Sequence, residues 1–160
     1  MTRRAAFEQA VLPHSRGLYA FIRHMNRREC DDIYQETLLA AWEGFDSLKD
    51  PEARRPWLYG IARHKAMDAH RRQYRREESW PEDVPQAGFE GHSTLRLDLD
   101  QALSTLKDED RALLYLVFNQ GFTYKTAGEA MGIPEGTVKS RVFALKKRLR
   151  ALMGEQEENP

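Results

Sequence analysis

Apolar residues recur at helical spacing along most of this 160-residue chain, and no stretch shows the alternation of apolar and polar residues that is typical of a strand. The longest such run lies near the C-terminus and places five side chains on one helix face: Val138, Val142, Leu145, Leu149 and Leu152. A second run, within residues 31–45, consists of Ile33, Thr37, Leu38, Ala41, Trp42 and Phe45. The sequence therefore predicts an all-α protein.

Residues 77–92 interrupt this pattern. The segment contains two prolines, two glycines and five acidic residues, but no lysine or arginine. Such a composition favours an acidic, irregular linker between two small helical domains. We expect the first domain over residues 1–76, the linker over 77–94, the second domain over 95–154 and a disordered tail over 155–160.

Prolines and caps divide the two domains into helices. In the first domain we expect helices over residues 7–25, broken near Pro13, over 31–45 and over 56–76. In the second domain a short helix precedes another that Asp108 is expected to cap.

Residues 123–149 are typical of a helix-turn-helix. Thr123 is a suitable cap for the first helix, Gly132 suits the tight turn, and Pro134 suits the first turn of the second helix. Gly128 costs about 1 kcal/mol relative to alanine inside a helix, which favours a position where the two helices approach very closely.

The face opposite the C-terminal apolar run has small and basic side chains. Residues 123–150 contain seven lysines and arginines but only two glutamates, although the whole chain has a formal net charge of zero. Small residues allow a helix to lie deep in the major groove, and flanking cations can reach phosphates or bases. The alternative interpretation is a solvated basic face. Candidate DNA contacts are Thr137, Lys139, Ser140, Arg141, Ala144 and Lys147.

Several classes of function are not indicated. Cys30 is the single cysteine and the five histidines show no ligand spacing, so we expect no metal and no cofactor. We find no nucleophile–base pair and no phosphate loop, which argues against an enzyme. We expect Cys30 to be a buried residue at a helix start rather than a redox sensor. We expect no signal peptide and a cytoplasmic protein, because the arginines near residue 3 are not followed by an apolar run and no apolar run is long enough to span a membrane.

Three motifs, in this order, resemble the extracytoplasmic-function (ECF) sigma factors of bacteria. They are the segment 31–37 with Ala41 and Trp42; the segment 56–58 with residues 61–63, Asp68, Arg71 and Arg72; and the segment 136–141 preceded by residues 131–134. The resemblance covers nearly the whole chain outside the linker. It implies a protein that is not an enzyme, that docks on core RNA polymerase, and that directs promoter-specific transcription initiation. Its partners would be core RNA polymerase, promoter DNA and, as a further candidate, an anti-sigma factor.

The resemblance also assigns roles to residues. The candidate DNA contacts of the helix-turn-helix would read the −35 element. The helix over 31–45 would bind polymerase through Asp32, Gln35, Glu36, Leu39 and Glu43. The helix over 56–76 would bind and melt the −10 element through Arg63, His64, Lys65, Arg71, Arg72, Arg75 and Arg76. Nearby aromatic residues that could stack on unpaired bases are Trp57, Tyr59 and Tyr74. For Trp57 the favoured interpretation is core packing against Trp42 or Phe45.

Two alternatives stay open at the level of sequence. A stand-alone transcription regulator with this helix-turn-helix would bind DNA without polymerase, but it would not need the docking residues Asp32, Gln35 and Glu36. A sigma-like decoy would sequester an anti-sigma factor, but it would not need the basic residues Arg71, Arg72 and Lys139.

Overall fold

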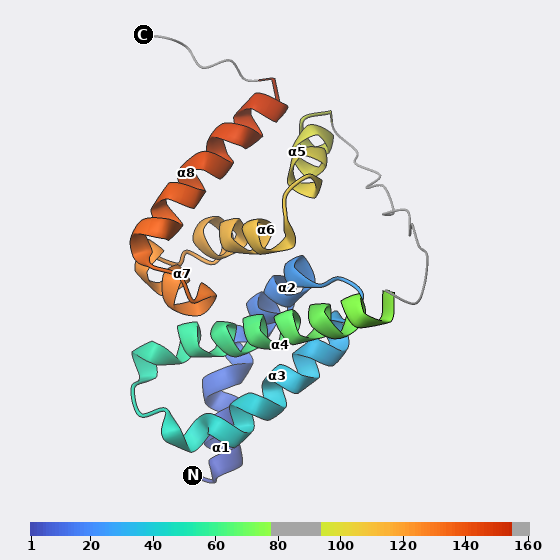
Figure 1. Cartoon of the computed structure of the whole chain (residues 1–160). Helices are drawn as coiled ribbons and strands as arrows, with labels where there is room; N and C mark the ends of the chain where they lie inside the picture. The colour runs from blue at the N-terminus through green and yellow to red at the C-terminus, as the bar shows by residue number, and fades with distance from the viewer. Residues whose placement is uncertain (78–93, 155–160) are drawn as a thin grey trace.

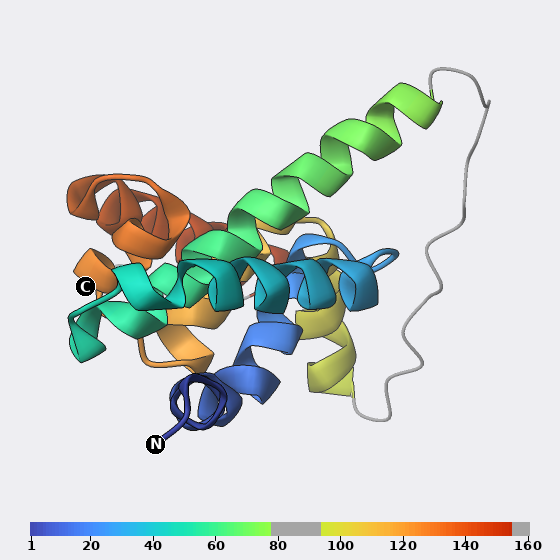
Figure 2. The same ribbon diagram turned by 90° about the horizontal axis from the view of Figure 1, so that it is seen from below.

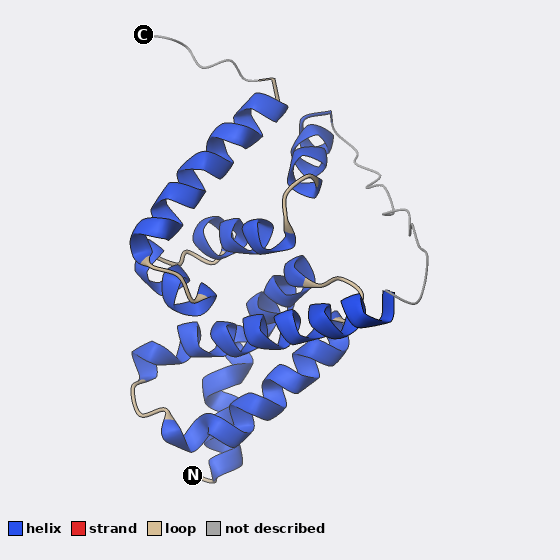
Figure 3. Cartoon of the chain, in the orientation of Figure 1, coloured by secondary structure: helices blue, strands red, loops and turns tan. Residues whose placement is uncertain are grey.

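Every regular element that the structure describes is helical (Figure 3). The structure is a computed structural model and describes residues 1–77 and 94–154. The N-terminal part contains α1 (Arg3–Val11), α2 (Ser15–Met25), α3 (Cys30–Gly44) and α4 (Arg54–Glu77). The C-terminal part contains α5 (Thr94–Ser104), α6 (Asp108–Leu114), α7 (Tyr124–Met131) and α8 (Glu135–Leu152). This confirms the predicted all-α fold class; the expected linker falls mostly, and the expected tail entirely, outside the described residues.

Short 3-10 and π-helical turns connect these elements. They are η1 (Leu12–His14), η2 (Phe45–Ser47), η3 (Pro51–Ala53) and the π-helical turn η4 (Tyr115–Asn119). Pro13 lies in η1, between α1 and α2, where the sequence predicts a break. We call α1–α4 the N-terminal unit and α5–α8, with η4, the C-terminal unit.

Helix α4 is the central element of the molecule (Figures 1 and 2). It packs against α3 on one side and against α7 on another, while α2 packs against α6. Helix α3 contributes Ile33, Thr37 and Ala41, which are fully buried as their spacing predicts. The hydroxyl of Thr37 is satisfied inside the core because it donates to the Ile33 carbonyl at 2.7 Å.

The helix-turn-helix is formed by α7 and α8, as predicted. The Thr123 hydroxyl accepts a hydrogen bond from the Thr126 N–H at 3.0 Å and caps α7. Gly132 follows α7 in the left-handed region, at a φ of 69°. A Cβ at Gly128 would lie 2.5 Å from the Ile133 carbonyl oxygen. Only glycine therefore fits at position 128, where the turn crosses α7.

Two predicted caps differ from the structure. Lys107, not Asp108, is the N-cap of α6; Asp108 is the first helical residue, and its carboxylate instead binds the Arg111 guanidinium in the same turn. Pro134 likewise occupies the N-cap of α8 rather than its first turn, with an extended ψ of 151°. Helix α6 therefore begins one residue earlier than the sequence predicts, and α8 begins one residue later.

The two units share one hydrophobic core. Tyr59 of α4 is fully buried, with its ring centroid 5.2 Å from that of Phe21 in the N-terminal unit and 5.0 Å from that of Phe122 in the C-terminal unit. Burial raises the pKa of the Tyr59 hydroxyl. Tyr59 therefore cannot stack on a DNA base in this arrangement, which corrects the expectation from sequence. The C-terminal unit also has a small cluster of its own, built from Leu106, Leu114 and Leu145.

Candidate nucleic-acid and partner interfaces

The predicted reading face of α8 is open to solvent. Of its six residues only Thr137 is half-buried; the others are exposed: Lys139, Ser140, Arg141, Ala144 and Lys147. Ser140 turns its hydroxyl inward and donates to the Gly136 carbonyl at 3.0 Å, so that it adds little bulk to this face. The apolar run on the other side, Val138, Val142 and Leu145, is buried and fixes the orientation of the helix. This face has the shape and charge to enter a DNA groove.

Phe143 is a further exposed residue of α8 that the sequence reasoning missed. Its side chain is 72% exposed. It lies four positions from Lys139 and four from Lys147, which places it beside both on the helix surface. The same helical spacing could have identified it from the sequence. A large apolar side chain at this place is suited to contact a thymine methyl group in the major groove.

The seven basic residues predicted on α4 fall, together with His70 and Tyr74, into three stripes with different surroundings. Residues seven and eleven positions apart share a face of a helix, which gives the stripes 63/70/74, 64/71/75 and 65/72/76. The three stripes are not equally available to DNA.

The first stripe faces the C-terminal unit. Arg63 binds Glu109 through two nitrogens, Nε at 3.1 Å and Nη2 at 2.9 Å, and its side chain is only 17% exposed. His70 lies 3.7 Å from the Asp108 carboxylate and contacts the Met25 carbonyl at 2.6 Å. The predicted DNA contact Arg63 is therefore occupied by a carboxylate of the other unit.

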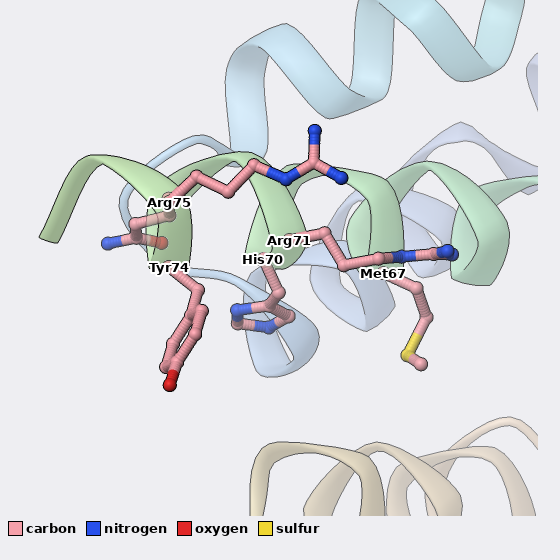
Figure 4. Close-up of a pocket in the computed structure, with 6 residues that line it drawn as sticks. Met67, His70, Arg71, Tyr74 and Arg75 are labelled. Carbon is pink, nitrogen blue, oxygen red and sulfur yellow. The ribbon is translucent and has the colours of Figure 1, made fainter. Parts of the chain in front are cut away.

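The second stripe, His64, Arg71 and Arg75, is exposed. Arg71 makes an ion pair with Asp68 within the helix, at 3.0 Å. Beside this stripe is a shallow hollow lined by Met67, His70, Arg71, Gln73, Tyr74 and Arg75 (Figure 4). Met67, His70 and Tyr74 leave α4 on the same side in this view, and Tyr74 is 68% exposed. An exposed aromatic ring next to arginines is a combination suited to single-stranded nucleic acid.

The third stripe, Lys65, Arg72 and Arg76, lies on the side of α4 that adjoins α3. Arg72 is 3.6 Å from the Glu36 carboxylate, and both Arg72 and Arg76 line a groove with residues of the predicted polymerase-docking face. The sequence reasoning assigned these arginines to DNA alone. Their position next to α3 could not be read from the spacing within one helix.

The predicted docking face is assembled on α3 as one surface. Asp32, Gln35, Leu39 and Glu43 are exposed and Glu36 is half-buried. Leu39 is 59% exposed, an apolar residue ringed by acidic and amide groups. Such a surface is typical of a protein interface with a basic partner.

Arg3 is another residue that the sequence reasoning missed. Its Nε is 2.8 Å from Asp46, and its guanidinium lies 3.9 Å above the Trp42 ring. Phe7 packs edge-on against both Trp42 and Phe45. These contacts anchor the end of α3 where the connection to α4 begins. No sequence motif marks them, because they join residues about forty positions apart.

Cys30 is buried at the first residue of α3, as expected. The Tyr19 hydroxyl lies 3.3 Å from its sulfur and donates to Asp31 at 2.6 Å. Within residues 1–77 and 94–154 no three side chains are placed to hold a metal ion together. None of the helices in those ranges is long and apolar enough to cross a membrane.

A helix-turn-helix with an open basic face, combined with a basic helix and an acidic docking face, defines a DNA-binding protein that works with a protein partner. Comparison with known families makes the class specific. Residues 10–76 match Sigma-70 region 2, and residues 96–149 match Sigma-70 region 4.

Curated relatives match over most of the chain. The ECF RNA polymerase sigma factor SigM of Mycobacterium tuberculosis is 32% identical over 154 residues, covering 94% of this chain and 79% of SigM. The RNA polymerase sigma factor NccH of Alcaligenes xylosoxydans xylosoxydans is 31% identical, covering 92% of this chain and 87% of NccH.

Solved structures agree with this assignment. The sigma factor RpoE of Bartonella quintana, in complex with the anti-sigma factor NepR, superposes with a TM-score of 0.76 at 28% identity, covering 93% of this chain and 97% of RpoE. CnrH, in complex with the cytosolic domain of CnrY, has a TM-score of 0.66 at 25% identity. This chain belongs to the ECF sigma factor family. It is not an enzyme: it binds RNA polymerase and DNA and directs the polymerase to promoters. A stand-alone regulator would need only the region that matches Sigma-70 region 4.

Proposed function

We propose that the C-terminal unit binds the −35 element, that the N-terminal unit binds the −10 element, and that α3 docks on core polymerase. The observation that supports this division is the placement of the exposed side chains. The second stripe of α4 and the reading face of α8 are exposed and basic, and α3 has an exposed acidic face with a leucine at its centre.

At the −35 element, α8 enters the major groove. Ser140 and Ala144 allow close approach because they are small, and Lys139, Arg141 and Lys147 reach phosphates or guanine edges from the flanks. Phe143 adds an apolar contact at one edge of this face.

At the −10 element, the exposed stripe of His64, Arg71 and Arg75 binds backbone phosphates of the opened strand, and Tyr74 stacks on an unpaired base. Arg72 and Arg76 serve the groove between α4 and α3 instead. Arg63 becomes available to DNA only when Glu109 releases it.

The docking face selects a basic surface of core polymerase by charge, and Leu39 supplies the desolvated centre. We further propose that an anti-sigma factor is a partner of this chain, because the solved structure of RpoE contains one. The chain would act in the cytoplasm, where polymerase and promoter DNA are found.

Charge reversal tests the docking face most directly. Asp32→Lys combined with Glu36→Lys is expected to lower affinity for core polymerase at least tenfold while leaving the helical content unchanged. The matched control reverses two exposed acidic residues of the other unit, Asp98→Lys with Glu129→Lys, and changes the net charge equally. Run-off transcription and co-purification with core polymerase measure both. Equal binding by the docking variant and wild type would show that α3 is not the docking helix.

A further inference from the structure

Arg54, the first residue of α4, has a guanidinium group with no hydrogen-bonding partner among the residues that the structure describes. Its Nε atom is shielded from solvent. The guanidinium lies 5.9 Å from the centre of the Phe45 ring, which is an apolar neighbour. A shielded cation without an acceptor is costly, because a charge removed from water needs a counter-charge or hydrogen bonds. This position therefore favours an acceptor that a ligand supplies.

The surroundings of Arg54 are positively charged. Arg55 follows it, and the first turn of α4 contains no acidic residue. His14, at the turn between α1 and α2, is close to both arginines: burial lowers its pKa, and the charges of Arg55 and Arg54 lower it further. The N-terminus of this 24-residue helix adds a partial positive charge. Asp50, in the preceding turn, accepts the Glu52 N–H at 3.0 Å. The cluster of Arg54, Arg55 and His14 therefore has an excess of positive charge that an anion would neutralise.

Arg54 lies on the side of α4 that carries the exposed basic stripe. Positions 54, 61, 68 and 75 are seven apart and share a face, and Arg75 belongs to the stripe. Asp68, which shares this face, is neutralised by its ion pair with Arg71 at 3.0 Å. From Arg54 to His64 the helix extends about 15 Å, the length of about four stacked nucleotides at roughly 3.4 Å each. A strand that follows the stripe toward the start of α4 therefore passes close to Arg54.

We propose that Arg54 binds a backbone phosphate of the opened −10 strand and extends the DNA-binding face of the N-terminal unit to the start of α4. This inference rests on the proposed assignment of the N-terminal unit to the −10 element. A phosphate supplies both the negative charge that the cluster lacks and the acceptor oxygens that the guanidinium lacks. The sequence predicts a helix only from residue 56, whereas the structure places Arg54 in the first turn of α4.

Two substitutions and one control test this in the holoenzyme. Arg54→Met removes the guanidinium but keeps an unbranched apolar stem beside Phe45, and Arg54→Lys keeps the charge. Arg23→Met is the control, because Arg23 is exposed in the last turn of α2, away from His14. The probe is a forked fragment of a promoter that this holoenzyme transcribes, in which each phosphate of the single-stranded −10 segment is replaced in turn by an uncharged methylphosphonate.

Wild-type holoenzyme is expected to lose affinity roughly three- to tenfold when the phosphate that meets Arg54 is made neutral. Arg54→Met should show the same loss on unmodified DNA and no further loss at that one phosphate, and the slope of log K against log salt should fall by about one. Arg54→Lys should keep part of the affinity, and Arg23→Met should behave as wild type. The free Arg54→Met chain should unfold at the same or a higher urea concentration, because a shielded charge without a partner has been removed.

Losses that simply add for Arg54→Met and every methylphosphonate would overturn the proposal. So would an Arg54→Met variant that binds core polymerase more weakly, since the acceptor would then be a carboxylate of the polymerase. Unchanged binding to both DNA and polymerase would show that Arg54 has no ligand.

Arg71→Ala separates this contact from the proposed function. Its own sensitive phosphate should lie several nucleotides from that of Arg54, because the two arginines are about 25 Å apart along α4. If neither variant changes the methylphosphonate pattern, the assignment of the N-terminal unit to the −10 element fails. A change with Arg71→Ala alone removes only the contact of Arg54.

Discussion

Helices α4 and α8 both contain many arginines and lysines, and the sequence predicts DNA binding for both. In α8 the basic and small residues face solvent along one surface, because the helix is packed on one side only. In α4 the basic residues are divided among a face toward the C-terminal unit, an exposed face and a groove shared with α3. The difference follows from position: α8 lies at the edge of the molecule, whereas α4 has a neighbour on either side.

This comparison shows that basic composition alone does not identify a DNA surface. A charged residue on a central helix can be bound by a carboxylate from elsewhere in the chain, as Arg63 is by Glu109. The same residue type on a peripheral helix stays available.

The largest expected effect concerns the support of α8. Gly128→Ala places a methyl group against the Ile133 carbonyl oxygen, a backbone atom that cannot move aside easily. We expect the free energy of unfolding to fall by about 2 kcal/mol or more, despite the gain of up to about 1 kcal/mol in helix propensity, and −35 binding to fall with it. The control Gly136→Ala has no atom within 4 Å of the new methyl group and should be neutral or slightly stabilising. Urea denaturation of the two variants measures the difference, and equal stabilities would contradict the close helix approach.

The second prediction tests the reading face itself. Arg141→Ala should weaken binding to −35 DNA by about 1–3 kcal/mol if the guanidinium contacts a base. Lys146→Ala removes one positive charge from the same helix, but its ammonium lies 5.4 Å from the Phe118 ring, on another face. It should therefore have a smaller effect that does not depend on DNA sequence. Binding of the holoenzyme to promoter and mutated promoter separates the two, and equal losses would reduce Arg141 to a general charge contact.

The third prediction compares two neighbours on α4. Arg71→Ala should lower the slope of log K against log salt by about one for −10 DNA, because it removes one phosphate contact. Arg72→Ala should leave that slope unchanged and should slightly tighten binding to core polymerase, because Glu36 then loses its nearby cation. Salt titrations of DNA binding and affinity for core measure the two effects. Equal salt slopes for the two variants would show that the stripes of α4 are not distinct.

Sequence reasoning succeeded where structure is decided locally. Thr123 and Gly132 act within one or two turns of chain, and both have the predicted roles. Gly128 also matches its prediction, because its role depends on a neighbour only five residues away.

Residues whose surroundings come from distant parts of the chain were harder to predict. The spacing within α4 gives no information about α6, so neither the burial of Tyr59 nor the pairing of Arg63 could be inferred. The same holds for Arg3, whose partners on α3 are about forty positions away. Phe143 differs, since helical spacing was sufficient to find it. Long-range packing, rather than helix formation, is therefore what sequence periodicity leaves undetermined here.

The smallest expected effect is a pH dependence confined to the inner side of the molecule. Burial lowers the pKa of His24, with further contributions from the nearby Arg111 and Arg23 guanidinium groups. Its ring packs on Tyr115, with centroids 4.9 Å apart, so that it contributes to the contact between the units. Because the folded pKa lies below the ordinary value of about 6.5, the unfolded chain takes up a proton first as the pH falls.

The free energy of unfolding should therefore decrease as the pH falls below about 6.5. Once the pH is below the folded pKa of His24, this histidine should cause no further decrease. His24→Gln should remove part of that dependence, whereas an α8 variant such as Lys146→Ala should keep it, because α8 contains no histidine. Urea denaturation at pH 7.5 and 5.5 measures both. If His24→Gln and wild type lose the same free energy of unfolding between these two pH values, the protonation of His24 is not coupled to stability. The contact between the units would then be no more sensitive to pH than α8.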